Sequence, residues 1–162
     1  MTSSSGLDLA LYHPQIPQNT GTLLRLASCL GIGINLIRPF GFIFDDKRLK
    51  RAGMDYINSA NFRIFDSFDG FCENFKDKRL IALVCNSSVA HNKFSYESND
   101  ILITGSEHYG FLKKDIDRIP HHVTIPMLPH GRSINMAIST AMVLSEAMSQ
   151  LNTYPPLTLG NN

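Results

Sequence analysis

The stretch "IPMLPHGRSINMAIST", residues 125–140, has the pattern first of a buried strand and then of a helix. Between the two halves lie two prolines, a glycine, a histidine, an arginine, a serine and an asparagine. A plain connection from a strand to a helix needs about two to six residues and one capping side chain. This stretch holds more polar side chains than a connection requires, which raises the question of what they contact.

Short, nearly continuous apolar runs recur along the chain, and the start of this stretch belongs to the last of them. They cover 7–13, 32–39, 79–85, 100–105 and 122–128, with a weaker candidate at 61–65. Continuous runs are typical of strands covered on both faces, and they predict a mainly parallel sheet. Helical patterns separate them at 19–31, 67–76 and 134–151. The alternation predicts one α/β domain over residues 1–162, a three-layer sandwich with irregular tails at 1–6 and 152–162.

The ends of two predicted helices carry capping signals. Asn19 or Thr20 is expected to cap the first helix, and Gly31 to end it. Ser133 is expected as the N-cap of the long last helix. That helix is apolar on more than one face, which predicts that it packs against the sheet and against something else, such as a second subunit.

Composition excludes several classes of protein. A formal net charge of +1 over 162 residues excludes nucleic-acid binding through a uniformly basic body, but it leaves room for a local basic patch. The three cysteines have no CxxC pairing, as expected for reduced thiols in the cytoplasm. No apolar run reaches transmembrane length, and the first ten residues lack the features of a signal peptide. We therefore expect a cytoplasmic protein with no membrane segment.

Three polar loops follow three of the apolar runs. They are "CNSSVAHNKFS" at 85–95, "GSEHYGF" at 105–111, and the stretch from residue 125. If the three strands are neighbours and parallel, these loops meet at one edge of the sheet and can form a single pocket. Gly105 and Gly110 let the backbone approach a flat ligand closely, so that its N–H and C=O groups could contact an adenine edge.

Each feature also has a simpler interpretation. The glycines can serve only to turn the chain, and a serine before a helix can serve only as a cap. The charged run 45–51 fits a solvated helix face as well as a phosphate contact. His121 and His122 lack metal-ligand spacing to any Cys, Asp or Glu, so no metal is expected. Arg25 lies between apolar neighbours, where a surface arginine is not required. The sequence has no Walker A, GxSxG or HExxH motif, which argues against a phosphohydrolase, a serine hydrolase and a zincin.

Four blocks of the chain together resemble the SPOUT-class RNA ribose methyltransferases. They are "ALYHPQIPQNTGTLLRLASCLG" (10–31), "RPFGFIFDDKRLKRAGMDY" (38–56), "GSEHYGF" (105–111) and "IPMLPHGRSINMAIS" (125–139). The resemblance runs from Leu9 to Ala147, with the blocks in the family's order and spacing. It is closest to the small group that methylates the 2′-hydroxyl of the wobble nucleotide in tRNA.

The resemblance implies properties that the hydrophobic pattern does not. It implies a trefoil knot near the C-terminus, a homodimer, and S-adenosylmethionine (SAM) bound in the knot and converted to S-adenosylhomocysteine. The implied partner is the anticodon arm of tRNA. General topology rules would instead predict an unknotted doubly wound sheet. Because the sulfonium of SAM already carries an activated methyl group, the resemblance implies no metal.

The resemblance also assigns roles to individual residues. The cofactor-binding positions are Leu83, Gly105, Glu107, Gly110, Ile125, Met127, Leu128 and Ser133. The catalytic positions are Arg25, Asn19, Ser133 and Asn135. The RNA-binding positions are Lys47, Arg48, Lys50, Arg51 and Arg132. Since arginine hardly deprotonates in proteins, Arg25 is expected to orient the ribose hydroxyl and stabilise developing charge rather than act as a base.

This chain departs from the family's usual pattern near the implied site. After Ser-x-Asn the family usually continues with a serine, which is often followed by an asparagine, but this chain has Ala137 and Ile138. Ser145 stands where close relatives often have tyrosine. Tyr109 stands where many relatives have arginine, and Gln15 where glutamate is frequent. Two alternatives therefore stay open: methylation of another tRNA or ribosomal RNA position, and a relative that binds RNA with weakened catalysis.

Overall fold

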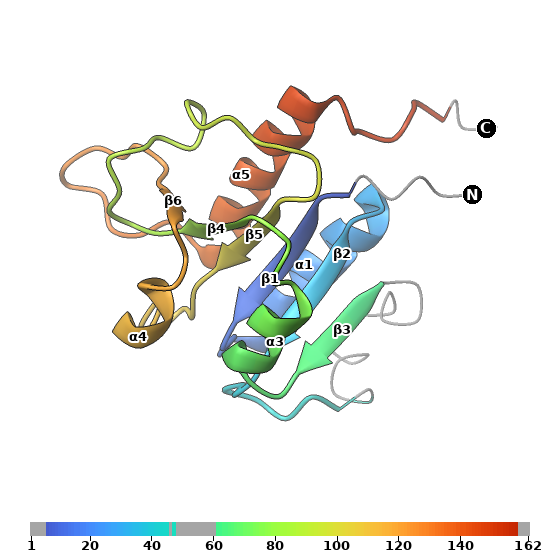
Figure 1. Cartoon of the computed structure of the whole chain (residues 1–162), viewed down its shortest axis with the longest axis vertical. Helices are drawn as coiled ribbons and strands as arrows, with labels where there is room; N and C mark the ends of the chain where they lie inside the picture. Colours follow the sequence, from blue (N-terminus) through green and yellow to red (C-terminus); the bar gives the residue numbers. More distant parts are fainter. Residues whose placement is uncertain (1–5, 46, 48–60, 159–162) are drawn as a thin grey trace.

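Six parallel strands form one sheet in the computed structural model, which describes residues 6–45, 47 and 61–158 (Figure 1). The sheet order is β3-β2-β1-β5-β4-β6. The strands are β1 (Asp8–Tyr12), β2 (Gly33–Ile37), β3 (Phe62–Phe65), β4 (Leu80–Leu83), β5 (Ile101–Thr104) and β6 (His121–Val123). All pairs are parallel, which confirms the sheet predicted from the continuous apolar runs.

Both faces of the sheet are buried, and the central strand β1 shows how. Leu9 and Leu11 belong to one core, with α1 (Pro17–Leu30) and α5 (Met136–Leu151). Ala10 and Tyr12, one residue out of phase, belong to a second core with α3 (Phe68–Asn74). A short helix, α4 (Lys113–Ile116), leads into that second core. Because side chains alternate across a strand, these two cores confirm the three-layer sandwich.

The helix caps differ from the predicted ones. Helix α1 begins at Pro17 after the N-cap Ile16, so Asn19 and Thr20 lie inside its first turn and the predicted caps were wrong. Proline suits the first helical position because the N–H that it lacks would have no partner in the helix. Gly31 ends α1 with a left-handed φ of 67°, as predicted.

Helix α5 is capped by Asn135, so the prediction that Ser133 caps it was wrong. The Oδ1 atom of Asn135 accepts hydrogen bonds from the N–H groups of Ala137 (2.9 Å) and Ile138 (3.2 Å). Asparagine, like serine, offers a short side-chain oxygen to the first turn, and the helix begins two residues later than the apolar pattern suggested.

Strand β6 is shorter than the predicted run 122–128, because it ends at Val123. Thr124 still pairs with the loop after β4: its N–H donates to Val89 O (2.9 Å), and its C=O accepts from His91 N–H (2.8 Å). Pro126 has no N–H to continue such a ladder. The weaker strand candidate at 61–65 is confirmed as β3, and the four-residue α4, too short to show a period, was not predicted.

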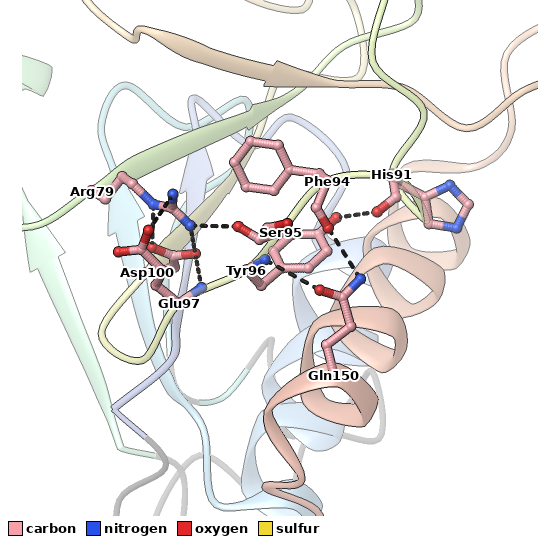
Figure 2. Close-up of polar contacts among 8 residues, drawn as sticks. All are labelled: Arg79, His91, Phe94, Ser95, Tyr96, Glu97, Asp100 and Gln150. Carbon is pink, nitrogen blue, oxygen red and sulfur yellow. Dashed lines mark hydrogen bonds and ion pairs between the residues drawn. The ribbon is translucent and has the colours of Figure 1, made fainter.

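The segment between β4 and β5 is fixed at both of its sides (Figure 2). The Arg79 guanidinium donates from Nε and Nη2 to the two carboxylate oxygens of Asp100, at 2.8 and 2.7 Å. On α5, Gln150 Oε1 accepts from Tyr96 N–H (3.2 Å) and its Nε2 donates to Phe94 O (3.1 Å). These contacts attach the loop to the start of β4 and to α5.

Candidate functional site

A cavity of ≈ 690 Å³ lies at the carboxyl ends of β4, β5 and β6. The loops after all three strands line it, which confirms that they meet at one edge of the sheet. The first turn of α1 adds Ile16 and Asn19 to the wall, and the start of α5 adds Asn135 and Met136. Residues distant in sequence therefore enclose one space.

Most of the residues expected to contact a cofactor line this cavity. They are Leu83, Gly105, Glu107, Gly110, Ile125, Met127 and Ser133. Leu128 does not line it, and 81% of its surface is exposed.

Only some of the expected catalytic residues line the cavity, and none of the described RNA-binding residues does. Asn19, Ser133 and Asn135 line the cavity, whereas Arg25 lies exposed on α1 and is not part of the wall. Arg132 is exposed beside it, outside the lining. Lys47 is exposed, and the expected RNA-binding residues Arg48, Lys50 and Arg51 lie outside the described residues.

The turn after β5 is closed by two backbone hydrogen bonds. Ser106 N–H donates to Gly110 O and Gly110 N–H donates to Ser106 O, each at 2.8 Å. A Cβ on Gly105 would lie 2.9 Å from the Gly110 carbonyl carbon and from the Phe111 ring, so only glycine fits there. Gly110 has a φ of +65°, which glycine adopts without strain. Both glycines are thus needed for the shape of the wall.

Glu107, at the tip of that turn, caps α1 from another part of the chain. Its carboxylate accepts hydrogen bonds from the N–H groups of Gln15 (2.7 Å) and Ile16 (3.1 Å). Helix α1 has no side-chain cap of its own. A negative charge at a helix N-terminus is stabilising, so Glu107 holds α1 against the cavity.

Two asparagines extend this contact across the cavity wall. Asn19 Nδ2 donates to Glu107 Oε1 (3.3 Å), and Asn19 Oδ1 accepts from Asn135 Nδ2 (3.1 Å). The other end of the Asn135 amide caps α5. The starts of α1 and α5 and the turn after β5 are therefore joined by one chain of hydrogen bonds, which fixes the orientation of both amides.

The side chains of Tyr12 and His13 support the same turn through a contact with Tyr109. The Tyr109 hydroxyl lies 2.7 Å from Nδ1 of His13, whose ring stacks on Tyr12 at 3.7 Å. Burial lowers the pKa of His13 below its ordinary 6.5, so the ring is neutral at pH 7. Burial also raises the pKa of Tyr109, which keeps its proton. The hydrogen bond between the Tyr109 hydroxyl and the His13 imidazole therefore joins two uncharged groups.

Sequence reasoning did not assign several of the residues in the wall. Cys85, Thr104, Ser106, His108, Phe111 and Ser139 line the cavity without having been predicted to bind anything. Most of them lie in or beside the three polar loops. Their position in these loops was therefore the feature of the sequence that could have identified them as cavity residues. In the described part of the chain, no group of three or more His, Cys, Asp or Glu side chains could hold a metal ion.

No described helix is both long and apolar enough to cross a membrane.

Comparison with known proteins agrees with this architecture. The SpoU rRNA methylase family matches residues 6–145. A tRNA (cytidine(34)-2′-O)-methyltransferase of Escherichia coli K12 is 37% identical over 155 residues, covering 94% of this chain and 98% of the relative. One of Photorhabdus asymbiotica is 40% identical over 152 residues, covering 90% and 94%.

Solved structures show the same fold. A Bacillus anthracis protein superposes with a TM-score of 0.86 at 37% identity, covering 94% of this chain and 98% of the other. A structure from work on the 2-OH methylation of C/U34 on tRNA gives 0.84 at 35% identity, covering 90% and 96%. The AdoMet complex of the methyltransferase AviRb from Streptomyces viridochromogenes gives 0.81 at 20% identity, covering 92% and 62%, a likeness of fold alone.

The parallel sheet and its helices thus form the same fold as these RNA methyltransferases. The chain belongs to the SpoU rRNA methylase family.

Proposed function

We propose that this protein is a SAM-dependent methyltransferase that 2′-O-methylates a ribose of tRNA in the cytoplasm, at the wobble nucleotide of the anticodon. One observation carries the proposal: the cavity at the ends of β4, β5 and β6 unites the residues expected to contact SAM, with the exception of Leu128. Support for the substrate comes from relatives at 37–40% identity that are named tRNA (cytidine(34)-2′-O)-methyltransferases.

The residues present fit SAM. A volume of ≈ 690 Å³ is ordinary for a cofactor pocket. Leu83, Ile125 and Met127 offer an apolar surface for the adenine, while Ser133 and Asn135 offer polar atoms on the other side. When bound, SAM supplies an activated methyl group on its sulfonium and leaves as S-adenosylhomocysteine.

The chain's own residues have to hold the ribose and lower the cost of losing its hydroxyl proton. Asn19 and Asn135, each fixed by hydrogen bonds, give the wall a set geometry for orientation. Arg25 lies six residues after Asn19 on α1, about 9 Å further along the helix axis. We assign it to the RNA side, where its permanent charge would stabilise the developing oxyanion or an adjacent phosphate.

Replacing Arg25 with alanine tests this division of roles. Because Arg25 does not line the cavity, Arg25→Ala should lower the rate of methyl transfer at least 100-fold while leaving the Kd for SAM within about twofold. Titration calorimetry with SAM and a labelled-methyl assay measure the two quantities. Arg118→Ala is the matched control and should retain activity, because its guanidinium lies over the ring of Phe68, which belongs to the second core. A parallel loss of SAM affinity in Arg25→Ala would contradict the assignment.

We further propose that Lys47, Arg48, Lys50, Arg51 and Arg132 bind the phosphates of the anticodon arm. Their charge supports this, as does the exposure of Lys47 and Arg132. The double variant Lys50→Ala/Arg51→Ala should weaken tRNA binding and flatten its dependence on salt, because two fewer phosphates are neutralised. An unchanged salt slope would make the run a solvated face.

The assembly and the chain path are proposals of the same kind. On α5, Ile138 and Met142 lie one helical turn apart, and 57% and 40% of their surfaces are exposed, which supports a homodimer through this face. After β6 the chain returns so that α5 packs against α1 and β5. We propose a trefoil knot in this path from the resemblance to the SPOUT class. The single domain is expected to span residues 1–162.

Sedimentation tests the dimer. The wild-type chain should sediment at twice its mass of 18.1 kDa, and Ile138→Glu/Met142→Glu should shift it toward the monomer. Leu157→Glu, in the tail at 96% exposure, is the control and should leave the mass unchanged. A monomeric wild type would refute this part of the proposal.

The deciding experiment is transfer of labelled methyl from SAM to tRNA from cells that lack wobble ribose methylation, with mapping of the labelled nucleotide. Label on the wobble ribose would support cofactor, reaction and substrate together. Label at another position would keep the reaction and replace the substrate. Binding of SAM and tRNA without turnover would instead indicate an RNA-binding relative with weakened catalysis, consistent with Ala137 and Ile138 at the start of α5.

A further inference from the structure

Tyr109 is an aromatic side chain that borders both the cavity and the solvent. It lines the cavity, and 45% of its surface is exposed. Phe111 also lines the cavity, but its ring packs against Tyr12 with centroids 5.0 Å apart. Among the described residues that line the cavity, Tyr109 is therefore the large aromatic ring with a free surface.

The ring of Tyr109 is held in place from its buried end. Its hydroxyl is hydrogen-bonded to Nδ1 of His13, which is only 6% exposed. His13 stacks on Tyr12, and the Tyr12 hydroxyl in turn donates to the buried Asp115. The backbone at Tyr109 lies within the turn closed by Ser106 and Gly110. A ring fixed in this way loses little conformational freedom when a ligand packs on it.

We propose that Tyr109 is a specificity residue whose ring stacks on the nucleobase of the ribose to be methylated. The inference rests on the proposed function. A ribose bound at the cavity has its base attached to it, so the base must lie next to the cavity wall. Unpaired bases are recognised mainly by stacking on aromatic side chains, and an uncharged tyrosine suits a base better than a phosphate. The protein thus contacts the base by its π-face, in addition to contacts with the backbone.

The test measures binding of two anticodon stem-loops to the SAM-saturated protein. One carries the normal wobble nucleotide, and the other keeps that ribose but lacks its base. The wild type should bind the normal RNA about tenfold more tightly than the abasic one, the order expected for one base–aromatic stack. Tyr109→Ala should bind both RNAs equally and weakly, with its Kd for SAM unchanged.

Two further variants separate the ring from its surroundings. Tyr109→Phe keeps the ring and loses the hydrogen bond to His13, so it should discriminate between the RNAs nearly as well as the wild type. Tyr154→Ala removes a tyrosine of similar exposure (46%) outside the cavity and should behave as the wild type.

Three results would overturn the proposal: equal loss in Tyr109→Phe and Tyr109→Ala, preserved discrimination in Tyr109→Ala, or a fall in SAM affinity in Tyr109→Ala. Failure of the proposed function is distinguishable from these. It would appear in the wild type, as no methylation of the normal stem-loop and no preference for it over the abasic one, and the stacking proposal would fall with it.

Discussion

Asn135 joins the start of α5 to the start of α1 through the two ends of one amide group. Its oxygen accepts from two N–H groups of α5, and its nitrogen donates to Asn19. A serine could supply the cap but would not reach across to α1 as well. This double use explains why an amide stands here, at the wall of the cavity.

Removing this amide should destabilise the protein measurably. Asn135→Ala is expected to lower the free energy of unfolding by about 1–2 kcal/mol, the usual cost of losing an N-cap together with a further hydrogen bond. Ser133→Ala, two residues away, should change it by less than about 0.5 kcal/mol, because Ser133 does not cap the helix. Urea denaturation of both variants measures the difference, and equal effects would argue against the observed cap.

His13 gives the protein a specific dependence on pH. Burial lowers its pKa below the unfolded value of about 6.5, although nearby Asp115 opposes the shift and Lys114 adds to it. The unfolded chain therefore binds the proton first. The stability that neutral His13 contributes is fully present above pH 6.5 and is lost as pH falls through that value toward the folded pKa.

The uncharged variant His13→Gln should lack this part of the pH dependence. Its free energy of unfolding is expected to fall less than that of the wild type between pH 8 and about pH 5.5. Urea denaturation across this range, with the difference between the two proteins plotted against pH, gives the measurement. A constant difference would mean that His13 titrates alike in the folded and unfolded chains.

At the scale of elements, the loop between β4 and β5 behaves as part of the scaffold. Asp100, 1% exposed at the start of β5, pairs with Arg79 at the start of β4, and Gln150 ties the loop to α5. The Arg79 guanidinium also lies 5.1 Å from the centre of the Phe94 ring. These contacts hold the loop at the end remote from the cavity (Figure 2). The beginning of the loop lines the cavity wall.

Breaking the ion pair between Arg79 and Asp100 should lower the free energy of unfolding, because it leaves a buried carboxylate without its cation. Arg79→Met is expected to lower the free energy of unfolding by about 3 kcal/mol, as for removal of one partner of a buried pair. The exposed pair Lys113–Asp117, with side chains 84% and 57% exposed, supplies the control. Lys113→Met should cost no more than about 0.5 kcal/mol. Similar small losses in both variants would show that Asp100 finds another partner or is reached by water.

At the scale of the molecule, the sheet order determines where the cavity lies. Strands β4, β5 and β6 lie side by side, and their carboxyl ends deliver three polar loops to one edge (Figure 1). Helices α1 and α5 pack on each other on one face, so that their starts complete the wall. The cavity is therefore a property of the whole fold and of no single segment.

Two exposed cysteines report on whether SAM occupies this cavity. Cys85 lines it, whereas Cys29 lies on α1 outside the lining. At SAM concentrations ten times the Kd, alkylation of Cys85 by iodoacetamide should slow about tenfold, while Cys29 should react at its original rate. Peptide mass spectrometry measures both rates in one sample. Unprotected Cys85 would place SAM elsewhere.

Much of the architecture followed from local pattern. Continuous apolar runs predicted the parallel strands, and Gly31 marked the end of α1. The order of polar loops after three strands indicated the pocket, because parallel strands place their carboxyl ends together. Asn19, Glu107 and Asn135 were all assigned to the site from the resemblance to known methyltransferases, and all three line the cavity.

The sequence by itself determined the alternation of strands and helices, the two buried faces of the sheet, and the family. Only the tertiary structure decided that Glu107 caps α1, that Asn135 rather than Ser133 caps α5, and that Tyr109 is anchored to His13. The physical reason is one of range. Apolar periodicity and backbone φ preferences act within a few residues, whereas each of these hydrogen bonds depends on which segments the fold brings into contact.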